Sequence, residues 1–350
     1  MKTDNSKILP IVIINWNGFI DTKECISSLL AENSENIIIY LIDNGSKKED
    51  VLAIQKHFSN NPKIKITFNP KNIGYTKAHN LILKELINEG YKYIFLLNND
   101  TIVIPKSITF LKENFQNFNM DLVSCKMIKS QNHNLMDSAG HKMLSSGEII
   151  PIGHNKNIEK YNIGFENIGA SAGAGLYSTE MLKDIGIFDD YFETGYEDAE
   201  LGLRAFVSGY KCYYKPEAEF YHKIGQSLKK VFDYKHALKT QVNIFYTYLK
   251  LVHWQIIVIN IIPWILRLLL ITLIGIFSFR FRYLKILYAA LGRILFRDIK
   301  EIFIARKASK RLRRIPWWQL LKKQEFFLKN DIQNFYKFII KGEKSHLENY

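Results

Sequence analysis

Two aspartates that follow short apolar runs near the start of the chain could bind a phosphorylated ligand. Asp43 ends the run at residues 36–42, and Asp100 follows the run at residues 92–97. The carboxylate of Asp43 suits the edge of a base or ribose, and the carboxylate of Asp100 suits a hard divalent cation that holds phosphates. Ordinary turns also favour Asp, Asn and Gly, so a purely structural origin is the alternative. Polar turns follow four runs in all: Asn15-Trp16-Asn17-Gly18, Asp43-Asn44-Gly45-Ser46, Asn69-Pro70-Lys71-Asn72-Ile73-Gly74 and Asn98-Asn99-Asp100.

A second acidic feature is the pair Glu197 and Asp198, which opens a helix-like stretch over residues 197–209. The positive end of a helix dipole favours the charged form of a carboxyl group. A carboxylate within hydrogen-bond reach of a hydroxyl can remove its proton, so we predict Asp198 as a general base with Glu197 beside it. Ordinary acidic capping of the helix is the alternative.

The glycine pattern narrows the choice of ligand. The first turn has one glycine, Gly18, instead of Gly-x-Gly-x-x-Gly, which argues against a dinucleotide cofactor. The sequence has no Gly-Lys-Ser/Thr, which excludes a P-loop. A nucleoside diphosphate that carries a further group fits both Asp43 and Asp100.

The elements that must position these residues alternate between strand and helix in the first half of the chain. This alternation predicts crossover units, and hence an α/β fold with a mostly parallel sheet and helices on both faces. Ligands of such sheets bind outside the carboxyl ends of the strands, where the polar turns lie. Strands are predicted over 8–14, 36–42, 63–68, 92–97 and 121–128, and helices over 20–31, 48–58, 75–89 and 105–117.

The composition is that of a folded chain with a real core. The 350 residues are 47% hydrophobic and 23% charged, which excludes disordered and collagen-like chains. The three cysteines, Cys25, Cys125 and Cys212, are far apart and fit no zinc spacing, which favours a reduced, intracellular protein. The first ten residues show no signal-peptide pattern.

The motifs together resemble the family 2 glycosyltransferases with the GT-A fold, in particular the rhamnosyltransferase-like branch that builds bacterial surface polysaccharides. The resemblance covers about residues 9–230. It is carried by Ile-Ile-Asn-Trp-Asn-Gly (13–18), Leu-Ile-Asp-Asn-Gly-Ser (41–46), Asn-Ile-Gly-Tyr-Thr-Lys-Ala-His-Asn (72–80), Leu-Leu-Asn-Asn-Asp-Thr (96–101), Asp-Ser-Ala-Gly (137–140), Ala-Gly-Ala-Gly-Leu (172–176), Gly-Ile-Phe-Asp-Asp-Tyr-Phe (186–192), Tyr-Glu-Asp-Ala-Glu-Leu-Gly-Leu-Arg (196–204) and Tyr-His-Lys-Ile-Gly-Gln-Ser (221–227).

The resemblance implies a role for each motif residue. Asp100 would be the last acid of the family's Asp-x-Asp motif, which holds Mg²⁺ or Mn²⁺, and His222 would lie beside the metal or the diphosphate. Asn98 stands where the first Asp is common, so we expect a weaker hold on the cation. No role follows for Lys77 or His79. Nucleotide binding would fall to Asn15, Trp16, Asp43, Asn72 and Gly74, and Gly173, Ala174 and Gly175 would lie near the acceptor or diphosphate.

The resemblance implies an inverting transfer of a sugar from a nucleotide-diphosphate donor, either deoxythymidine-diphosphate rhamnose or a uridine-diphosphate hexose. The acceptor would be a lipid-linked or polysaccharide glycan of the cell surface. A non-catalytic nucleotide-sugar-binding or assembly subunit at the membrane is the main alternative, because of Asn98. A nucleotidyltransferase needs a basic glycine-rich loop near the first strand, which residues 15–18 do not provide.

The last fifth of the chain is strongly basic. Residues 280–350 hold 18 Lys and Arg against 6 Asp and Glu, so +12 of the formal net charge of +14 lies there. Residues 256–279 are apolar and long enough to cross a bilayer. The run 284–305 resembles an interfacial helix. Its apolar face holds Leu284, Leu287, Leu291, Ile294, Leu295, Ile299 and Ile302, and its basic face holds Lys285, Arg293, Arg297 and Lys300.

We predict that this region binds an anionic membrane surface at the cytoplasmic face, in a peripheral or re-entrant arrangement. A single crossing over 256–279 would export the basic tail against the positive-inside tendency, and is the first alternative. A soluble helical subdomain is the second, and nucleic-acid binding is disfavoured because no aromatic stacking platform is evident. The predicted domains are a GT-A catalytic domain over 1–230, with a nucleotide-sugar half over about 1–128 and an acceptor half over about 129–230, and a membrane-associating helical region over 231–350.

Overall fold

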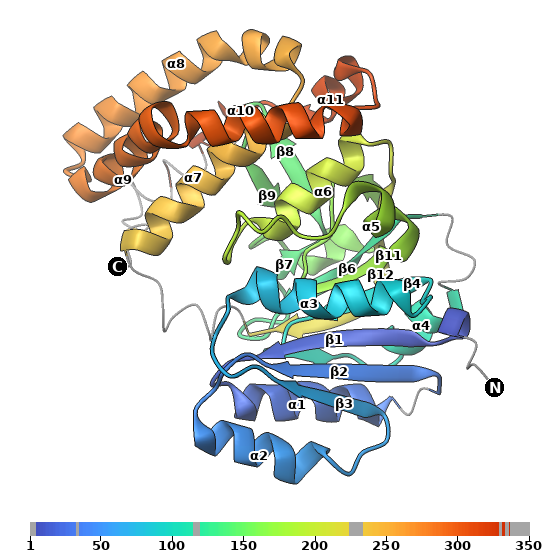
Figure 1. Ribbon diagram of the computed structural model, residues 1–350. Helices are drawn as coiled ribbons and strands as arrows, with labels where there is room; N and C mark the ends of the chain where they lie inside the picture. Colours follow the sequence, from blue (N-terminus) through green and yellow to red (C-terminus); the bar gives the residue numbers. More distant parts are fainter. Residues whose placement is uncertain are drawn as a thin grey trace. The chain divides into compact units, whose positions relative to one another are not determined.

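The computed structural model describes residues 5–32, 35–114, 120–223, 234–328, 331–332 and 336 (Figure 1). The end of the helix predicted over 105–117, the motif residues 224–227 and the predicted domain boundary near 230 lie outside the described residues. The chain divides into two compact units. The first comprises Met1–His141 and Pro151–Lys229, and the second comprises Lys142–Ile150 and Lys230–Tyr350.

The first unit is built on one sheet with the strand order β10-β12-β6-β11-β4-β1-β2-β3. Strands β4, β1, β2 and β3 are parallel, whereas β11 runs antiparallel to both β4 and β6. The α/β prediction is confirmed, and the sheet is parallel in its first half and mixed in its second. The strands are β1 (Leu9–Asn15), β2 (Ile37–Asp43), β3 (Ile64–Phe68), β4 (Tyr93–Leu97), β5 (Thr101–Val103), β6 (Leu122–Lys129), β7 (Met136–Ser138), β10 (Phe165–Asn167), β11 (Ala174–Ser178) and β12 (Cys212–His222).

The first three helices of this unit lie where the alternating pattern predicts them, with every end within one residue of the expected position. The helix predicted from 105 begins two residues later. The first four helices are α1 (Phe19–Ala31), α2 (Lys48–Phe58), α3 (Tyr75–Asn88) and α4 (Ser107–Asn114), and two more follow in the second half, α5 (Thr179–Ile185) and α6 (Glu197–Val207). Short 3₁₀ turns occur at Asn5–Lys7 and Ile158–Tyr161.

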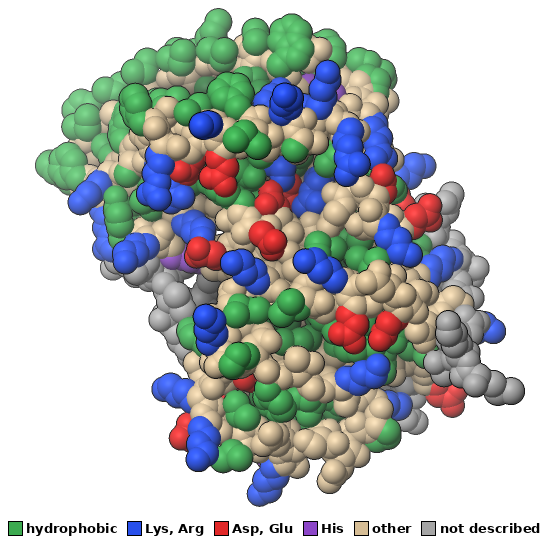
Figure 2. All heavy atoms as spheres, in the orientation of Figure 1, with side chains coloured by type: hydrophobic (Ala, Val, Ile, Leu, Met, Phe, Trp, Pro, Cys, Tyr) green, Lys and Arg blue, Asp and Glu red, His purple; other side chains and the backbone are tan. Residues whose placement is uncertain are grey.

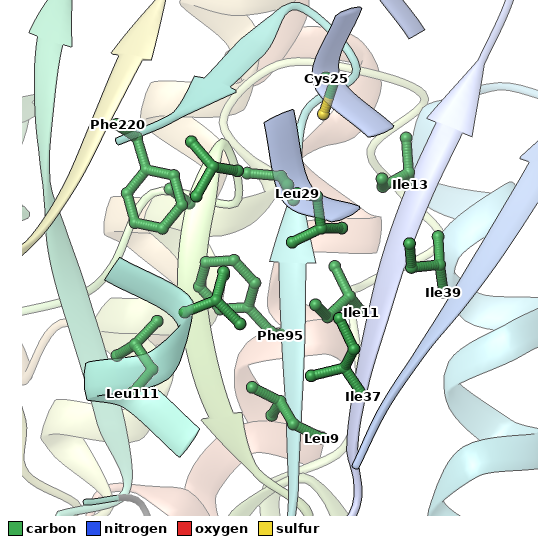
Figure 3. Packing of buried hydrophobic residues seen from close by; sticks show 14 of the residues in the cluster. Leu9, Ile11, Ile13, Cys25, Leu29, Ile37, Ile39, Phe95, Leu111 and Phe220 are labelled. Atoms are coloured by element: carbon green, nitrogen blue, oxygen red, sulfur yellow. The ribbon is translucent and has the colours of Figure 1, made fainter. Parts of the chain in front are cut away.

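The core packs the first half of the sheet against α1 and α4. Alternate residues of a strand point to the same face, so Leu9, Ile11 and Ile13 of β1 all lie in it, fully buried. Figure 3 shows them beside Phe95 of β4 and Phe220 of β12. The cysteines Cys25, Cys125 and Cys212 are buried and free, and burial raises the pKa of each thiol. Because β1, β2, β3 and β4 are parallel, their carboxyl ends lie at one edge of this packed sheet.

A buried arginine anchors α6. Arg204 donates through Nη1 to the carbonyl oxygens of Ile185 and Ile187, at 2.9 and 2.8 Å, and through Nε and Nη2 to Glu200 one turn earlier. Glu200 is completely buried, so removal of the Arg204 guanidinium would take away the positive charge that faces it and would destabilise the fold. The anchored helix places its first turn, which holds Glu197 and Asp198, at a defined position.

The second unit combines a small sheet with helices. The sheet has the order β13-β8-β9, with β8 (His141–Leu144), β9 (Ile149–Pro151) and β13 (Gln324–Glu325). The run predicted over 284–305 is helical throughout, with a π-helical turn in its middle. The helices are α7 (Tyr234–Leu251), α8 (Trp254–Phe277), α9 (Phe281–Gly292), the π-helical turn Arg293–Asp298, α10 (Ile299–Ala308), a 3₁₀ turn at Ser309–Leu312 and α11 (Trp317–Lys323).

One detail of the predicted interfacial pattern is wrong. Leu284, Leu287, Ile294 and Ile302, which were expected on an outward apolar face, are buried, and α9 and α10 pack along α7. The exposed apolar side chains of this run are Tyr288, Leu295, Phe296, Phe303 and Ile304, of which only Leu295 belongs to the predicted face. Periodicity alone identifies an apolar face, but it does not tell whether a neighbouring helix covers that face.

Candidate active site

The first part of the site is the paired ends of β1 and β2. Asn15 and Asp43 are register partners, so both side chains lie at the same edge. Asp43 accepts hydrogen bonds from Asn15 Nδ2 at 2.8 Å and from the backbone N–H of Ser46 at 3.0 Å. Both side chains are completely buried, and Trp16 is partly exposed. Asp43 therefore holds the two turns together, and its contact with a base stays a prediction.

A short chain of side chains links this edge to the turn after β4. Thr22 donates through Oγ1 to Asn15 Oδ1 at 2.7 Å, and Asn99 donates through Nδ2 to Thr22 Oγ1 at 3.0 Å. Asp100 is the next residue along the chain. The structure therefore brings Asp43 and Asp100 to one edge of the sheet, as the polar turns predict.

The turn after β3 joins the same edge through Asn44. Its Nδ2 donates to Asn72 Oδ1 at 3.0 Å and to the carbonyl oxygen of Gly74 at 3.3 Å. Gly74 has φ +88°, and a Cβ there would lie 3.2 Å from the carbonyl oxygen of Glu193. Glycine is required by both its conformation and its surroundings. Asn72 and Gly74 thus lie beside the Asp43 turn, and their contact with a ribose or diphosphate stays a prediction.

Asp100 faces a row of histidines and aspartates. Strand pairing sets His222 opposite Thr101, and His222 Nε2 lies 3.2 Å from Asp100 Oδ1. His222 Nδ1 lies 2.8 Å from Asp137 Oδ2, and His154 Nδ1 lies 3.3 Å from Asp137 Oδ1. Burial alone would lower the pKa of His222, but the Asp100 and Asp137 carboxylates raise it to about 10.

The donor set at Asp100 fits a divalent cation in part. The 2.8 Å contact to Asp137 orients the His222 ring and leaves the buried Nε2 directed at Asp100 Oδ1, 3.2 Å away. A carboxylate oxygen and an imidazole nitrogen suit Mn²⁺, and the carboxylate also suits Mg²⁺. Cation binding at Nε2 requires that this nitrogen loses its proton. Within the described ranges, no group of three or more His, Cys, Asp and Glu is arranged to hold a metal.

The two acids at the start of α6 have different surroundings. Asp198 accepts hydrogen bonds from the backbone N–H of Ala172 at 3.1 Å and of Ala199 at 2.8 Å, and its side chain is 21% exposed. Glu197 is 6% exposed, and its Oε2 makes no hydrogen bond to the described residues. Burial, and then the charge of Asp198, raises the pKa of Glu197 to about 8. Adjacent carboxyl groups with such different surroundings can serve different roles.

The stretch Ala172–Gly173 joins these acids to the turn after β4. The carbonyl oxygen of Gly173 accepts a hydrogen bond from the backbone N–H of Asn98 at 3.0 Å, next to the Ala172 bond to Asp198. A Cβ on Gly173 would lie 3.3 Å from Asn98 Nδ2 and 2.7 Å from Met127 Cε, so a side chain would fill this space. Ala174 and Gly175 continue into β11, buried beside β4.

Tyr75 lies at the turn after β4. Its hydroxyl donates to Asn98 Oδ1 at 3.0 Å. Burial, and then the charges of Glu197, Asp198 and Asp100, raise the pKa of Tyr75 well above its ordinary value. One phenol at the start of α3 therefore lies within electrostatic reach of the predicted base and the predicted metal ligand.

Several residues of the site had no role in the sequence patterns. Tyr75 and Asp137 stand inside motifs that resemble the family, and this was the available signal. His141 directly follows the motif 137–140 without belonging to it, and its Nε2 lies 4.0 Å from Asp198 Oδ2. Lys77 is exposed, whereas His79 packs against Tyr75, and burial lowers the pKa of His79 to about 4, as for a neutral core histidine.

A mixed α/β sheet that gathers polar turns at the carboxyl ends of its parallel strands is the architecture of a nucleotide-binding α/β protein. Residues 11–186, half of the chain, match the family model described as "Glycosyl transferase family 2". The chain belongs to this family.

Individual relatives are distant. An uncharacterized glycosyltransferase of Haemophilus influenzae is 25% identical over 114 residues, which cover 31% of this chain and 44% of that protein. The chain thus matches less than half the length of that relative. The crystal structure of GalNAc-T7 with UDP, GalNAc and Mn²⁺ superposes with a TM-score of 0.51 at 15% identity, over 61% of this chain and 43% of that one. The structure of S. aureus TarS 1-349 gives a TM-score of 0.46 at 14% identity, over 69% and 71% of the two chains. The likeness to GalNAc-T7 shows the fold.

Proposed function

We propose that this protein is an inverting glycosyltransferase that moves a sugar from a nucleotide-diphosphate donor to a lipid-linked or polysaccharide acceptor in cell-surface glycan synthesis. The observation that carries the proposal is a short series of hydrogen bonds that connects the turn holding Asp100 to Asp198. The backbone N–H of Asn98, two residues before Asp100, donates a hydrogen bond to the carbonyl oxygen of Gly173. The backbone N–H of the preceding residue, Ala172, donates a hydrogen bond to the Asp198 carboxylate. A donor that reaches the Asp100 turn would therefore have its sugar near a carboxylate.

The donor would bind along the edge formed by β1, β2 and the turn after β3. Asn15, Trp16, Asp43, Asn72 and Gly74 are the residues proposed for the nucleotide. Because Asn15 and Asp43 are already hydrogen-bonded, their contribution would be to hold the surrounding turns in place, which lowers the entropy cost of binding. The donor sugar is proposed to be a deoxythymidine-diphosphate rhamnose or a uridine-diphosphate hexose, and GalNAc-T7, of similar fold, is solved with UDP.

The leaving diphosphate would be stabilised at Asp100. A bound Mg²⁺ or Mn²⁺ would supply positive charge for the departing phosphate oxygens. Asp100 and His222 would hold the ion, and Asp137 would fix the ring of His222 through Nδ1. Since Asn98 is bound to Tyr75, the protein offers two side chains here, and we expect a cation affinity that depends on the diphosphate.

The acceptor would be activated at Asp198. In a single in-line displacement, an acceptor oxygen forms a bond to the anomeric carbon, the bond from that carbon to the diphosphate oxygen breaks, and the acceptor proton passes to Asp198. Because the pKa of Glu197 is raised to about 8, its carboxyl group is mostly protonated at neutral pH. Glu197 therefore adds little negative charge beside the proposed base. The small residues Gly173, Ala174 and Gly175 would let the sugar or diphosphate approach the backbone closely.

The location proposed for this activity is the cytoplasmic face of the membrane. The catalytic domain would comprise residues 1–230, with its nucleotide-sugar half over about 1–128 and its acceptor half over about 129–230. Residues 231–350 would bind an anionic membrane surface. Helix α8 supports this, because it is long and apolar enough to enter a bilayer and only 11% of its most apolar 18-residue stretch is buried.

A donor screen tests the proposal. The purified chain is mixed with a panel of nucleotide sugars, with Mg²⁺ or Mn²⁺ and with EDTA, and release of the nucleoside diphosphate is measured. We expect turnover with one donor class, loss of turnover in EDTA, and a loss of about 10²- to 10³-fold in Asp100→Asn. Lys77→Ala, on the exposed side of α3, is the matched control. Binding of a donor by calorimetry without turnover across a broad acceptor panel would favour a non-catalytic binding subunit instead.

A further inference from the structure

Helix α8 presents a broad apolar surface. Ile262 is 68% exposed, Leu266 is 60% exposed and Phe277 is 80% exposed. Figure 2 shows hydrophobic side chains gathered along this helix, with Lys and Arg beside them. A soluble core helix would bury such a surface. The exposed apolar side chains of α8 are Trp254, Val258, Ile259, Ile261, Ile262, Ile265, Leu266, Leu269, Leu270, Leu273, Ile276 and Phe277.

The opposite side of α8 carries polar anchors. Arg267, the one charged residue of this helix, donates to Asp331 through Nε at 2.6 Å and Nη2 at 2.9 Å. Its Nη2 also lies 3.1 Å from Glu148 Oε2. Asn260 is 4% exposed and donates to the Tyr248 hydroxyl of α7 at 3.1 Å. One side of the helix is therefore held by its own unit along most of its length.

The position of Arg267 argues against a crossing. It is the fourteenth of 24 residues in α8, so in a perpendicular span its side chain would lie near the bilayer centre. Its partner Glu148 belongs to the segment 142–150 of the second unit. The residues before and after this segment, His141 and Pro151, belong to the first unit. A crossing would thus bring Glu148, Asp331 and a short hairpin to the depth where unpaired polar groups are most costly. Breaking the contacts instead would leave Arg267 without its partners.

Basic residues complete the surface. The neighbouring run from α9 to α11 exposes apolar side chains, among them Phe296 at 88%, and a set of Lys and Arg. Apolar side chains next to basic ones on exposed helices are the pattern of segments that lie in a membrane interface. The exposed basic residues are Arg282, Lys285, Arg297, Lys300, Lys307, Lys310, Arg311, Arg314, Lys322 and Lys323.

We propose that α8 lies in the plane of the membrane, inserted into one leaflet of an anionic bilayer by its exposed apolar face, while Arg267 remains bound to Asp331 and Glu148. The occupant of this face is an anionic lipid surface, because ten exposed Lys and Arg of α9 to α11 stand against one exposed acid, Glu301. The proposal rests on the membrane location in the proposed function and not on sugar transfer. Its experiments need no sugar donor, so their outcome is independent of whether the chain is a transferase.

Vesicle flotation tests the surface. The purified full chain is mixed with vesicles of phosphatidylcholine, with and without phosphatidylglycerol, and the bound fraction is measured against lipid concentration. We expect binding that requires phosphatidylglycerol and weakens with salt. Ile262→Asp with Leu269→Asp should lower the apparent affinity about tenfold or more, because each acid opposes insertion. Leu52→Asp places an acid on α2 at a leucine that is 54% exposed, close to the 56% of Leu269, and this control should bind as the unchanged chain does.

A depth measurement separates an in-plane helix from a span. Single cysteines replace Val258, Ile262, Ile265, Leu269 and Ile276 and receive a fluorophore, since the native cysteines are buried. Lipids with a quencher near the headgroup or deep in the acyl chain then report the depth of each site. An in-plane α8 places all five sites at one shallow depth. A depth that is greatest near Ile265 and shallow at both ends would overturn the proposal, as would a stable dimer that covers this face and leaves the vesicles unbound.

Discussion

The two halves of the candidate site satisfy their polar groups very differently. On the nucleotide side, Asp43, Asn15 and Thr22 are completely buried, and hydrogen bonds connect each to the next. On the acid side, Glu197 Oε2 and His141 Nδ1 are buried but have no hydrogen-bond partner among the described residues. Both halves belong to the same unit.

The difference indicates where ligand chemistry is expected. A buried polar atom without a partner costs about 1 to 3 kcal/mol, so a native fold keeps it only where something else is gained. The satisfied network around Asp43 is a scaffold that forms with the fold. The unsatisfied atoms near Asp198 are the ones that an incoming sugar, acceptor hydroxyl or cation can satisfy. Three substitutions test this division, taken from the largest expected effect to the smallest.

Asp198→Asn should have the largest effect. The amide cannot accept the acceptor proton, so we expect transfer to fall by about 10²- to 10⁴-fold. Nucleotide binding by calorimetry should stay unchanged, because Asp198 lies on the acid side. Glu180→Gln is the matched control, since Glu180 is also an acid in the first turn of a helix but is exposed. Normal turnover in Asp198→Asn would show that this acid only caps α6.

Asp43→Asn should act on stability. Asp43 Oδ1 and Oδ2 each accept an N–H, and an asparagine has only one oxygen to offer. One donor would then face the new amide group, which should lower the free energy of unfolding by about 1 to 3 kcal/mol, measured by urea denaturation. Asp50→Asn is the control, because Asp50 Oδ2 accepts an N–H from Phe19 at 3.0 Å and an amide oxygen can replace it. Equal stability of Asp43→Asn and the unchanged chain would contradict the scaffold role.

The nucleotide side was more predictable from the sequence than the acid side, for a physical reason. Its strands and helices are local patterns, and parallel strands joined by helices bring their ends to one edge without further information. Asp43, Asn72 and Asp100 therefore lie where their turns predict. The mixed half of the sheet gave no such pattern, because β11 enters between β4 and β6 by antiparallel pairing with residues far away in sequence.

The acid side depends on contacts between residues that are far apart in the sequence. Asp198 meets Ala172 from the first turn of α6, the helix that Arg204 anchors, and His222 meets Asp100 through the pairing of β12 with β5. Neither spacing nor periodicity encodes these contacts, so the family motifs were the only signal for His222. His154 and His141 lie outside those motifs, and their positions beside Asp137 and Asp198 follow from the tertiary fold alone.

The pH dependence of folding gives the smallest and most specific test, through Glu197→Gln. Burial and Asp198 raise the pKa of Glu197 from 4.5 to about 8, so the folded chain holds this proton more tightly than the unfolded chain. Its contribution to stability is therefore complete below about pH 4.5 and is lost as the pH rises towards 8, with a slope of at most about 1.4 kcal/mol per pH unit.

Glutamine keeps the shape of Glu197 but cannot ionise, so the variant should lose this slope and gain stability relative to the unchanged chain as the pH rises from 5 to 8. Urea denaturation at several pH values measures the difference between the two chains, and the same series on Glu180→Gln shows the behaviour of an exposed first-turn acid. Parallel pH profiles for Glu197→Gln and the unchanged chain would mean that Glu197 ionises like an exposed acid. The contrast between the two sides would then rest on His141 Nδ1 alone.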